Sequence, residues 1–169
     1  MPVAVDTVNA SHMTQTEWNE AASGMLHLVE VRVLPAMELY RFATAATPDA
    51  WYAASWWCGK SAHEGLLQYA KSINESLSRA ARRCLAVPPR NAMDVLISVR
   101  VLQPLSAWSG TPKTLRQKDS RGRYGNRQEP DRAITQLYIP GLDPRIAKAN
   151  CLPWREVFAG APSLLPRAR

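Results

Sequence analysis

The segment from Lys60 to Val87 most constrains the fold, because it carries the clearest helical pattern in the chain. Small and apolar residues recur at helical spacing on one face of it: Leu66, Ala70, Ile73, Leu77, Ala80 or Ala81, and Cys84. Polar residues fill the other face: Lys71, Asn74, Glu75, Ser78 and Arg82. Two prolines follow the segment, and a proline disfavours helical backbone in the residue before it. The pattern therefore predicts one long amphipathic helix.

Apolar segments on both sides of this helix have the composition of β-strands. LHLVEVRVLP (26–35) and MELYRFAT (37–44) precede it, and MDVLISVRVLQPLSAW (93–108) and AITQLYIPGL (133–142) follow it. The third segment alternates apolar and polar positions, as a strand with one buried face does. This order of strands and helix predicts an α+β fold. A length of 169 residues suits one domain, which we place at 25–169. Residues 1–24 are polar and predict an N-terminal tail, or a short helix around 17–22.

The composition limits the classes of protein to consider. Three cysteines without paired spacing (Cys58, Cys84 and Cys151) make a disulfide framework unexpected. No apolar run approaches the roughly 20 residues of a membrane-spanning helix. The N-terminus lacks the basic start and apolar core of a secretory signal. We therefore expect no membrane insertion, and a protein that is cytoplasmic or secreted without a cleavable signal.

Charge is distributed unevenly along the chain. Residues 1–64 hold seven acidic and three basic residues, and residues 65–169 hold seven acidic and eighteen basic ones. Many of the basic residues lie in a glycine-containing stretch, 109–132, that reads as a long loop. Arg121, Arg123 and Arg127 in this loop are candidates for contact with a macromolecular target, a protein rather than RNA. A solvated basic loop without a partner is the alternative.

The stretch MELYRFATAATPDAWYAASWWCGK (37–60) places a cation inside an apolar strand, close to several aromatic residues. A buried Arg41 needs a partner anion. Its planar guanidinium suits a diphosphate, and tryptophan faces suit planar rings. NAD has both groups. Alternatively, Trp56 and Trp57 are core residues, as tryptophan pairs more often are.

Other chemistries have weaker signals. His12, His27 and His63 do not form a metal-ligand spacing with the cysteines, so we expect no metal cofactor. The chain has no glycine-rich phosphate loop and no nucleophile motif of the GxSxG kind.

Several short motifs together resemble the ADP-ribosyltransferase superfamily, whose members bind NAD in a cleft of a split β-sandwich. "LYRFA" resembles the tyrosine–arginine of an early strand, and "AASWWCG" resembles the serine-bearing second strand. "QLYIPGL" resembles the strand of glutamate, three apolar residues and proline. The resemblance spans roughly residues 37–142 by the order of elements. It implies an ADP-ribosyltransferase-like fold with NAD as the substrate.

The resemblance also implies roles for individual residues. Arg41 would be a catalytic residue that binds the nicotinamide-side ribose or the diphosphate. Ser55 would brace the cofactor site, Trp56 would be a further cofactor-binding residue, and Trp57 would shield the nicotinamide ring. Gln136 stands where the family places its catalytic glutamate, so it would hold a ribose hydroxyl without acting as a base.

These observations favour transfer of ADP-ribose from NAD to a macromolecule, most simply a host protein, by a bacterial effector or toxin. Two alternatives remain open at this point. The first is a binding module without catalysis that contacts nucleic acid or an acidic protein through the loop 109–132. The second is hydrolysis of NAD without transfer.

Overall fold

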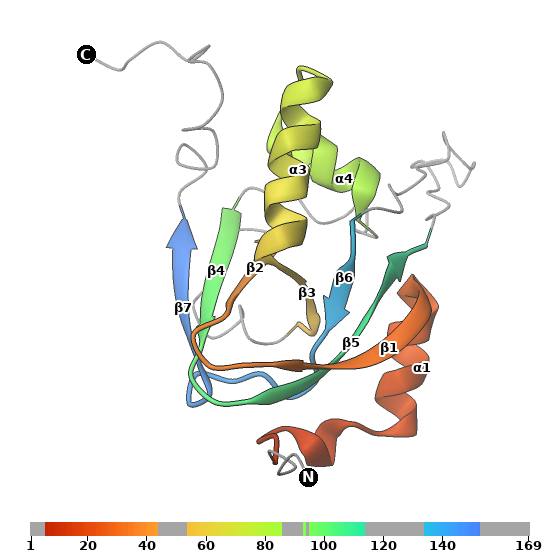
Figure 1. The fold of residues 1–169 in the computed structure, drawn as a ribbon, viewed down its shortest axis with the longest axis vertical. Coiled ribbons are helices and arrows are strands. Elements are labelled where there is room, and N and C mark those ends of the chain that lie inside the picture. Colours follow the sequence, from red (N-terminus) through yellow and green to blue (C-terminus); the bar gives the residue numbers. More distant parts are fainter. Residues whose placement is uncertain (1–5, 44–53, 86–92, 94, 114–133, 153–169) are drawn as a thin grey trace, which may run out of the picture.

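The structure of the chain is a computed structural model that describes residues 6–43, 54–85, 93, 95–113 and 134–152. It is an α+β fold, as the sequence predicts, with one antiparallel sheet of seven strands (Figure 1). The strands are β1 (Met25–Val33), β2 (Glu38–Ala43), β3 (Trp56–Gly59), β4 (Val95–Val101), β5 (Leu105–Pro112), β6 (Gln136–Tyr138) and β7 (Ala147–Leu152). Their order across the sheet is β1-β5-β6-β3-β2-β4-β7. The split β-sandwich of the resembled family stays a prediction.

The helices lie on the outer face of this curved sheet. They are η1 (Ala10–His12), a turn of 3-10 helix, followed by α1 (Gln15–Gly24), α3 (Lys60–Ser72) and α4 (Leu77–Cys84). In Figure 1, α3 and α4 stand together, with α3 packed against β2 and β3, and α1 lies beside β1 and β5. None of the helices that the structure describes is long and apolar enough to cross a membrane.

Three clusters of buried side chains hold these layers together. The inner cluster joins residues from strands β1 to β5 with residues that follow β6, and the sheet curves around it. It includes Val33, Leu39, Trp57, Val99, Leu105 and Ile139. The helix cluster fills the space under α3 and α4 and includes Phe42, Cys58, Leu66, Leu77, Leu96 and Ile134. The N-terminal cluster lies under α1 and includes Ala21, Met25, Trp108 and Tyr138. The inner cluster and the two outer clusters therefore occupy opposite faces of one sheet.

The prediction of one long helix over 60–87 is wrong, because the chain turns between α3 and α4. Asn74 has a φ of +52°, a left-handed conformation that a continuous helix does not contain. The side chain of Ser76 then accepts a hydrogen bond from the backbone N–H of Arg79 and begins α4. An ion pair of 2.7 Å joins Glu75 to Arg83 across the start of α4. The apolar spacing continues through the turn because both helices pack on the same cluster.

The apolar run 93–108 also differs from the expected single strand. Its residues form β4 and the first half of β5, with a turn at Leu102–Pro104 between them. Pro104 lacks the N–H that a central strand needs, so the ladder ends before it. The strand expected at 133–142 is short, and Gly141, at a φ of +72°, follows it in a turn. Strand β7 was not expected from the sequence.

Residues before the sheet pack against it. Asn9 is buried, and its side-chain amide donates 2.8 Å hydrogen bonds to the carbonyls of Ser106 and Pro140. Its carbonyl oxygen accepts the backbone N–H of Ser106, also at 2.8 Å. Helix α1 forms where the sequence allowed a tail or a short helix, and Thr14 caps it by accepting from the N–H of Glu17.

Candidate functional site

Arg41 lies on the inner face of the sheet, beside a tryptophan. Across the ladder it pairs with Ile97, which belongs to the inner cluster, so the two side chains share that face. Its guanidinium carbon lies 5.9 Å from the centroid of the Trp57 ring, within the range of a cation–π contact. Burial lowers the pKa of Arg41, although a guanidinium remains charged near neutral pH. Trp57 itself is 1 % exposed, so its ring packs within the protein core.

Gln136 lies on the opposite face. It begins β6 and alternates with Leu137, which pairs with Trp57 and packs against the inner cluster. Ile134 and Tyr138, two residues to either side, belong to the clusters under α3 and α1. Gln136 is 4 % exposed. The structure therefore brings Arg41 and Trp57 together but does not bring Gln136 to the same side of the sheet.

Ser55 and Trp56 lie near the aromatic residues of β6. The backbone carbonyl of Ser55 accepts a 2.7 Å hydrogen bond from the N–H of Ile139, and its side chain contacts the hydroxyl of Tyr138. The Trp56 ring packs edge-on against the Tyr138 ring, with centroids 5.0 Å apart. Burial, with the hydrogen bond that Tyr138 donates to Glu17, raises the pKa of Tyr138 to about 12. These two residues brace β3 against β6 and α1.

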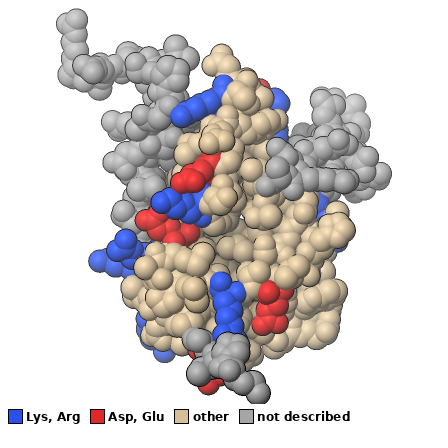
Figure 2. Space-filling view, viewed as in Figure 1, with Lys and Arg blue, Asp and Glu red and all other residues tan. Residues whose placement is uncertain are grey.

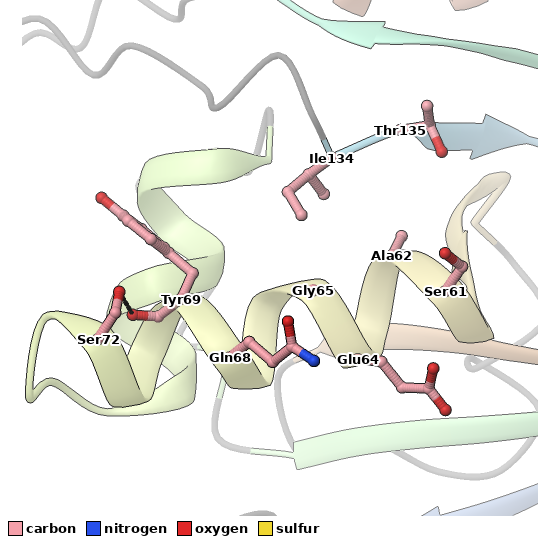
Figure 3. Close-up of a pocket in the computed structure, with 9 residues that line it drawn as sticks. All are labelled: Ser61, Ala62, Glu64, Gly65, Gln68, Tyr69, Ser72, Ile134 and Thr135. Carbon is pink, nitrogen blue, oxygen red and sulfur yellow. Dashed lines mark hydrogen bonds between the residues drawn. The ribbon is translucent and has the colours of Figure 1, made fainter.

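A pocket of about 550 Å³ opens between α3 and the residues that enter β6. Its lining combines hydroxyl, amide and carboxylate groups with one aromatic ring: Ser61, Ala62, Glu64, Gly65, Gln68, Tyr69, Ser72, Ile134 and Thr135. In Figure 3, Ile134 and Thr135 face Ala62 and Gly65 across it, and the carboxylate of Glu64 is directed away from β6, at the rim. The volume is in the range of small-molecule sites. Polar groups of these types bind the hydroxyl groups of a sugar.

Gly65 keeps this pocket next to β6. A Cβ atom there would lie 2.8 Å from the Cδ1 of Ile134, so α3 approaches the strand where it has no side chain. Thr135 lines the pocket and is the residue directly before Gln136. The pocket is thus adjacent in the chain to the position where the sequence predicts catalysis, and it lies on the helix side of the sheet, away from Arg41.

A stacked pair of titratable rings lies on the same side of the sheet. The rings of Tyr40 and His63 have centroids 4.1 Å apart and an interplanar angle of 12°. The hydroxyl of Tyr40 donates a 2.8 Å hydrogen bond to Glu38; burial and this bond raise the pKa of Tyr40 to about 12. Burial lowers the pKa of His63, while the charges of Glu64 and Glu38 act in the opposite direction. The buried Nε2 atom of His63 has no hydrogen-bond partner among the described residues.

Sequence reasoning missed the pocket because it treated the segment 60–87 only as a packing helix and singled out none of the residues of this segment that line the pocket. A second periodic pattern was present, with small and polar side chains at Ser61, Gly65, Gln68 and Ser72. Such a pattern on one helix face indicates either close packing against another element or a binding surface. The sequence of the helix alone does not distinguish these two roles.

The expected target-binding residues Arg121, Arg123 and Arg127 lie outside the described residues. On the face shown in Figure 2, the acidic and basic side chains of the described residues are interspersed and form no patch of one charge. Among the described residues, no three histidine, cysteine or acidic side chains gather as metal ligands do. In the part of the chain that the structure describes, Cys58 and Cys84 are buried and form no disulfide, and burial raises the pKa of Cys58 to about 12.

Comparisons with known proteins do not identify a family for this chain. No family model matches the chain, and no curated protein matches it. One solved structure, described as Rhs1-CT in complex with cognate immunity protein RhsI1, has a TM-score of 0.46 and 11 % sequence identity. The match covers 77 % of this chain and 83 % of that chain. At this level of likeness it supports neither a family assignment nor an activity.

Proposed function

We propose that the protein binds NAD in the pocket between α3 and β6 and cleaves its N-glycosidic bond, transferring ADP-ribose to a macromolecular target. The pocket carries the proposal, because its lining combines hydroxyl, amide and carboxylate groups and includes Thr135, the residue directly before Gln136. Ser61, Gln68 and Thr135 supply donors and acceptors for ribose hydroxyls. Tyr69 supplies an aromatic surface for a planar ring.

Cleavage of the N-glycosidic bond requires stabilisation of positive charge on the ribose, and the pocket contains groups that can provide it. Loss of nicotinamide leaves positive charge on the ribose carbon, and nearby oxygen atoms with partial or full negative charge lower the energy of that state. Glu64, at the rim, carries the carboxylate among the residues that line the pocket. Gln136 can orient a ribose hydroxyl through its amide but cannot remove a proton near neutral pH. In this proposal Glu64, or a group of the target, activates the acceptor.

Arg41 enters the proposal separately. Its guanidinium lies beside Trp57 on the inner face, so a ligand in the pocket between α3 and β6 does not reach it. The role in cofactor binding that the sequence gives to Arg41, Ser55, Trp56 and Trp57 thus stays a prediction, and it concerns a position other than this pocket. A variant of Arg41 separates the two positions, as described in the Discussion.

Labelled NAD tests the proposal and its nearest alternative together. Wild-type protein is mixed with NAD that carries the label on its adenine side, with and without a cell lysate. We expect nicotinamide release in both mixtures and label on macromolecules only with lysate. Nicotinamide release with label only on free ADP-ribose would indicate hydrolysis instead. No release in either mixture would contradict the proposal and favour a module that binds without catalysis.

A further inference from the structure

Strand β1 forms one edge of the sheet. It pairs with β5 on one side, and among the described residues no strand pairs with its other side. A register shift between Leu26 and Val29 interrupts the ladder, and His27 there has a φ of +55°. Pro35 follows the strand at its other end. The regular part of this edge is therefore the five residues 29–33, whose outer backbone groups pair with no other strand in the part of the chain that the structure describes.

The side chains of this segment are partly apolar and exposed. Val29 is 61 % exposed, and Leu26 and Leu34, at either end, are 42 % and 50 % exposed. Val31 and Val33 share the face of Val29 and extend into the inner cluster. Glu30 and Arg32 are exposed on the other face. An exposed edge that combines apolar residues with unpaired backbone is a surface for strand addition.

We propose that this edge binds a second copy of the same chain, with the two β1 strands antiparallel and centred on Val31. In that register Glu30 of each copy lies opposite Arg32 of the other, which gives two ion pairs across the two-fold axis. Val29 lies opposite Val33 on the other face. The sheet then continues through both copies, and the apolar side chains of the edge become buried.

Self-complementary charge favours a second copy over an unrelated strand. A two-fold interface must bring one patch against itself, so its charges must match about the axis. Glu30 and Arg32 are each one residue from Val31 and have opposite signs, which satisfies this condition. The bulge at 26–29 and Pro35 limit the straight segment to five residues. A shift of one residue would turn the side chains to the other face, and a register centred on Glu30 or Arg32 would place like charges opposite each other on the axis. The register centred on Val31 avoids both.

Charge exchange tests the proposal. Purified full chain is examined by sedimentation equilibrium, with circular dichroism to confirm folding of each variant. Wild type is expected to form a dimer. Glu30→Arg and Arg32→Glu each place like charges opposite each other and should weaken self-association at least about tenfold, which corresponds to about 1.4 kcal/mol. The double variant E30R/R32E should dimerise like wild type. An equimolar mixture of the two single variants should form a heterodimer.

A matched control separates this edge from general charge effects. Lys71→Glu on α3 changes charge by the same amount as Arg32→Glu at an exposed position away from β1, and this variant should dimerise like wild type. A wild-type protein that stays monomeric at high concentration would overturn the proposal. So would a dimer that Glu30→Arg and Arg32→Glu leave unchanged, since it must use another surface. Failure of the mixed single variants to associate would refute the antiparallel register.

Discussion

The guanidinium of Arg41 lies against the ring of Trp57, with 5.9 Å between its central carbon and the ring centroid. This contact joins β2 to β3 on the inner face of the sheet, where Trp57 is part of the core. The arrangement gives Arg41 a structural environment in the protein itself. It also separates Arg41 from the pocket between α3 and β6.

Replacing Arg41 distinguishes a structural role from a role in NAD binding. We expect Arg41→Ala to lower the free energy of unfolding by about 1–2 kcal/mol, through loss of a partly buried cation–π contact. We expect NAD affinity to change less than about twofold, because the pocket lies on the other face. Urea unfolding and NAD titration followed by tryptophan fluorescence measure the two quantities. Unchanged stability together with lost NAD affinity would support the sequence-based assignment of Arg41 and contradict the pocket.

Variants of Gln136 test the catalytic position that the sequence predicts on β6. Gln136→Ala should lower transfer at least about tenfold, which is about 1.4 kcal/mol of transition-state stabilisation. Gln136→Glu should retain NAD cleavage, because a carboxylate can also hold the ribose hydroxyl. Since Gln136 is 4 % exposed, each variant needs a thermal unfolding curve beside its rate. A folded Gln136→Ala variant that transfers label at the wild-type rate would show that the site has been misplaced.

The buried environment of His63 predicts that the folded protein loses stability in mild acid. Burial lowers its pKa, so the unfolded chain binds a proton more readily than the folded one. Stability is therefore complete above the ordinary histidine pKa of about 6.5 and decreases as the pH falls below it, towards the lower folded value. Glu38 and Glu64 reduce the size of this effect. His63→Phe keeps a ring for stacking on Tyr40 and should flatten the dependence of unfolding free energy on pH between about 5 and 7. An unchanged slope in the variant would assign the effect to other groups.

Asn9 tests whether the residues before the sheet are part of the folded unit. Its three hydrogen bonds to Ser106 and Pro140 are buried, so Asn9→Ala leaves one N–H and two carbonyl groups without this partner. We expect a loss of about 2–4 kcal/mol in the free energy of unfolding, from buried polar groups left unsatisfied. Gln103→Ala, at an exposed turn, is the matched amide control and should have little effect. Equal stability of both variants would mean that residues 1–24 behave as the tail that the sequence predicts.

The sequence predicted most elements of the fold because their local patterns agree with their tertiary environment. The α+β class and the strands at β1 and β2 follow from apolar runs and from the position of the helical segment. The sequence did not predict the turn at Asn74, because α3 and α4 pack on the same buried cluster and the apolar spacing therefore continues through both helices. The sequence did not predict strand β7, because the composition of this segment does not indicate a strand and its strand structure depends on pairing with β4.

The candidate site was less predictable than the fold. Trp56 and Trp57 belong to β3 and Gln136 to β6, and these strands pair. The side of the sheet that each side chain faces depends on register, which motifs do not specify. That is why Arg41 and Gln136 were expected together and lie apart. The pocket could not be predicted from local patterns, because it depends on the close approach of Gly65 and Ile134, which are far apart in the sequence.

The rate of nicotinamide release from NAD tests the central claim most directly, when it is compared among three folded proteins: wild type, the double variant Gln68→Ala/Thr135→Val, and the control Gln103→Ala. The double variant removes two polar groups from the pocket and leaves both faces of the sheet packed. We predict that wild type and the control release nicotinamide at the same rate and that the double variant is slower by at least about tenfold. No release by wild type, or equal rates in all three proteins, would contradict NAD cleavage in the pocket between α3 and β6.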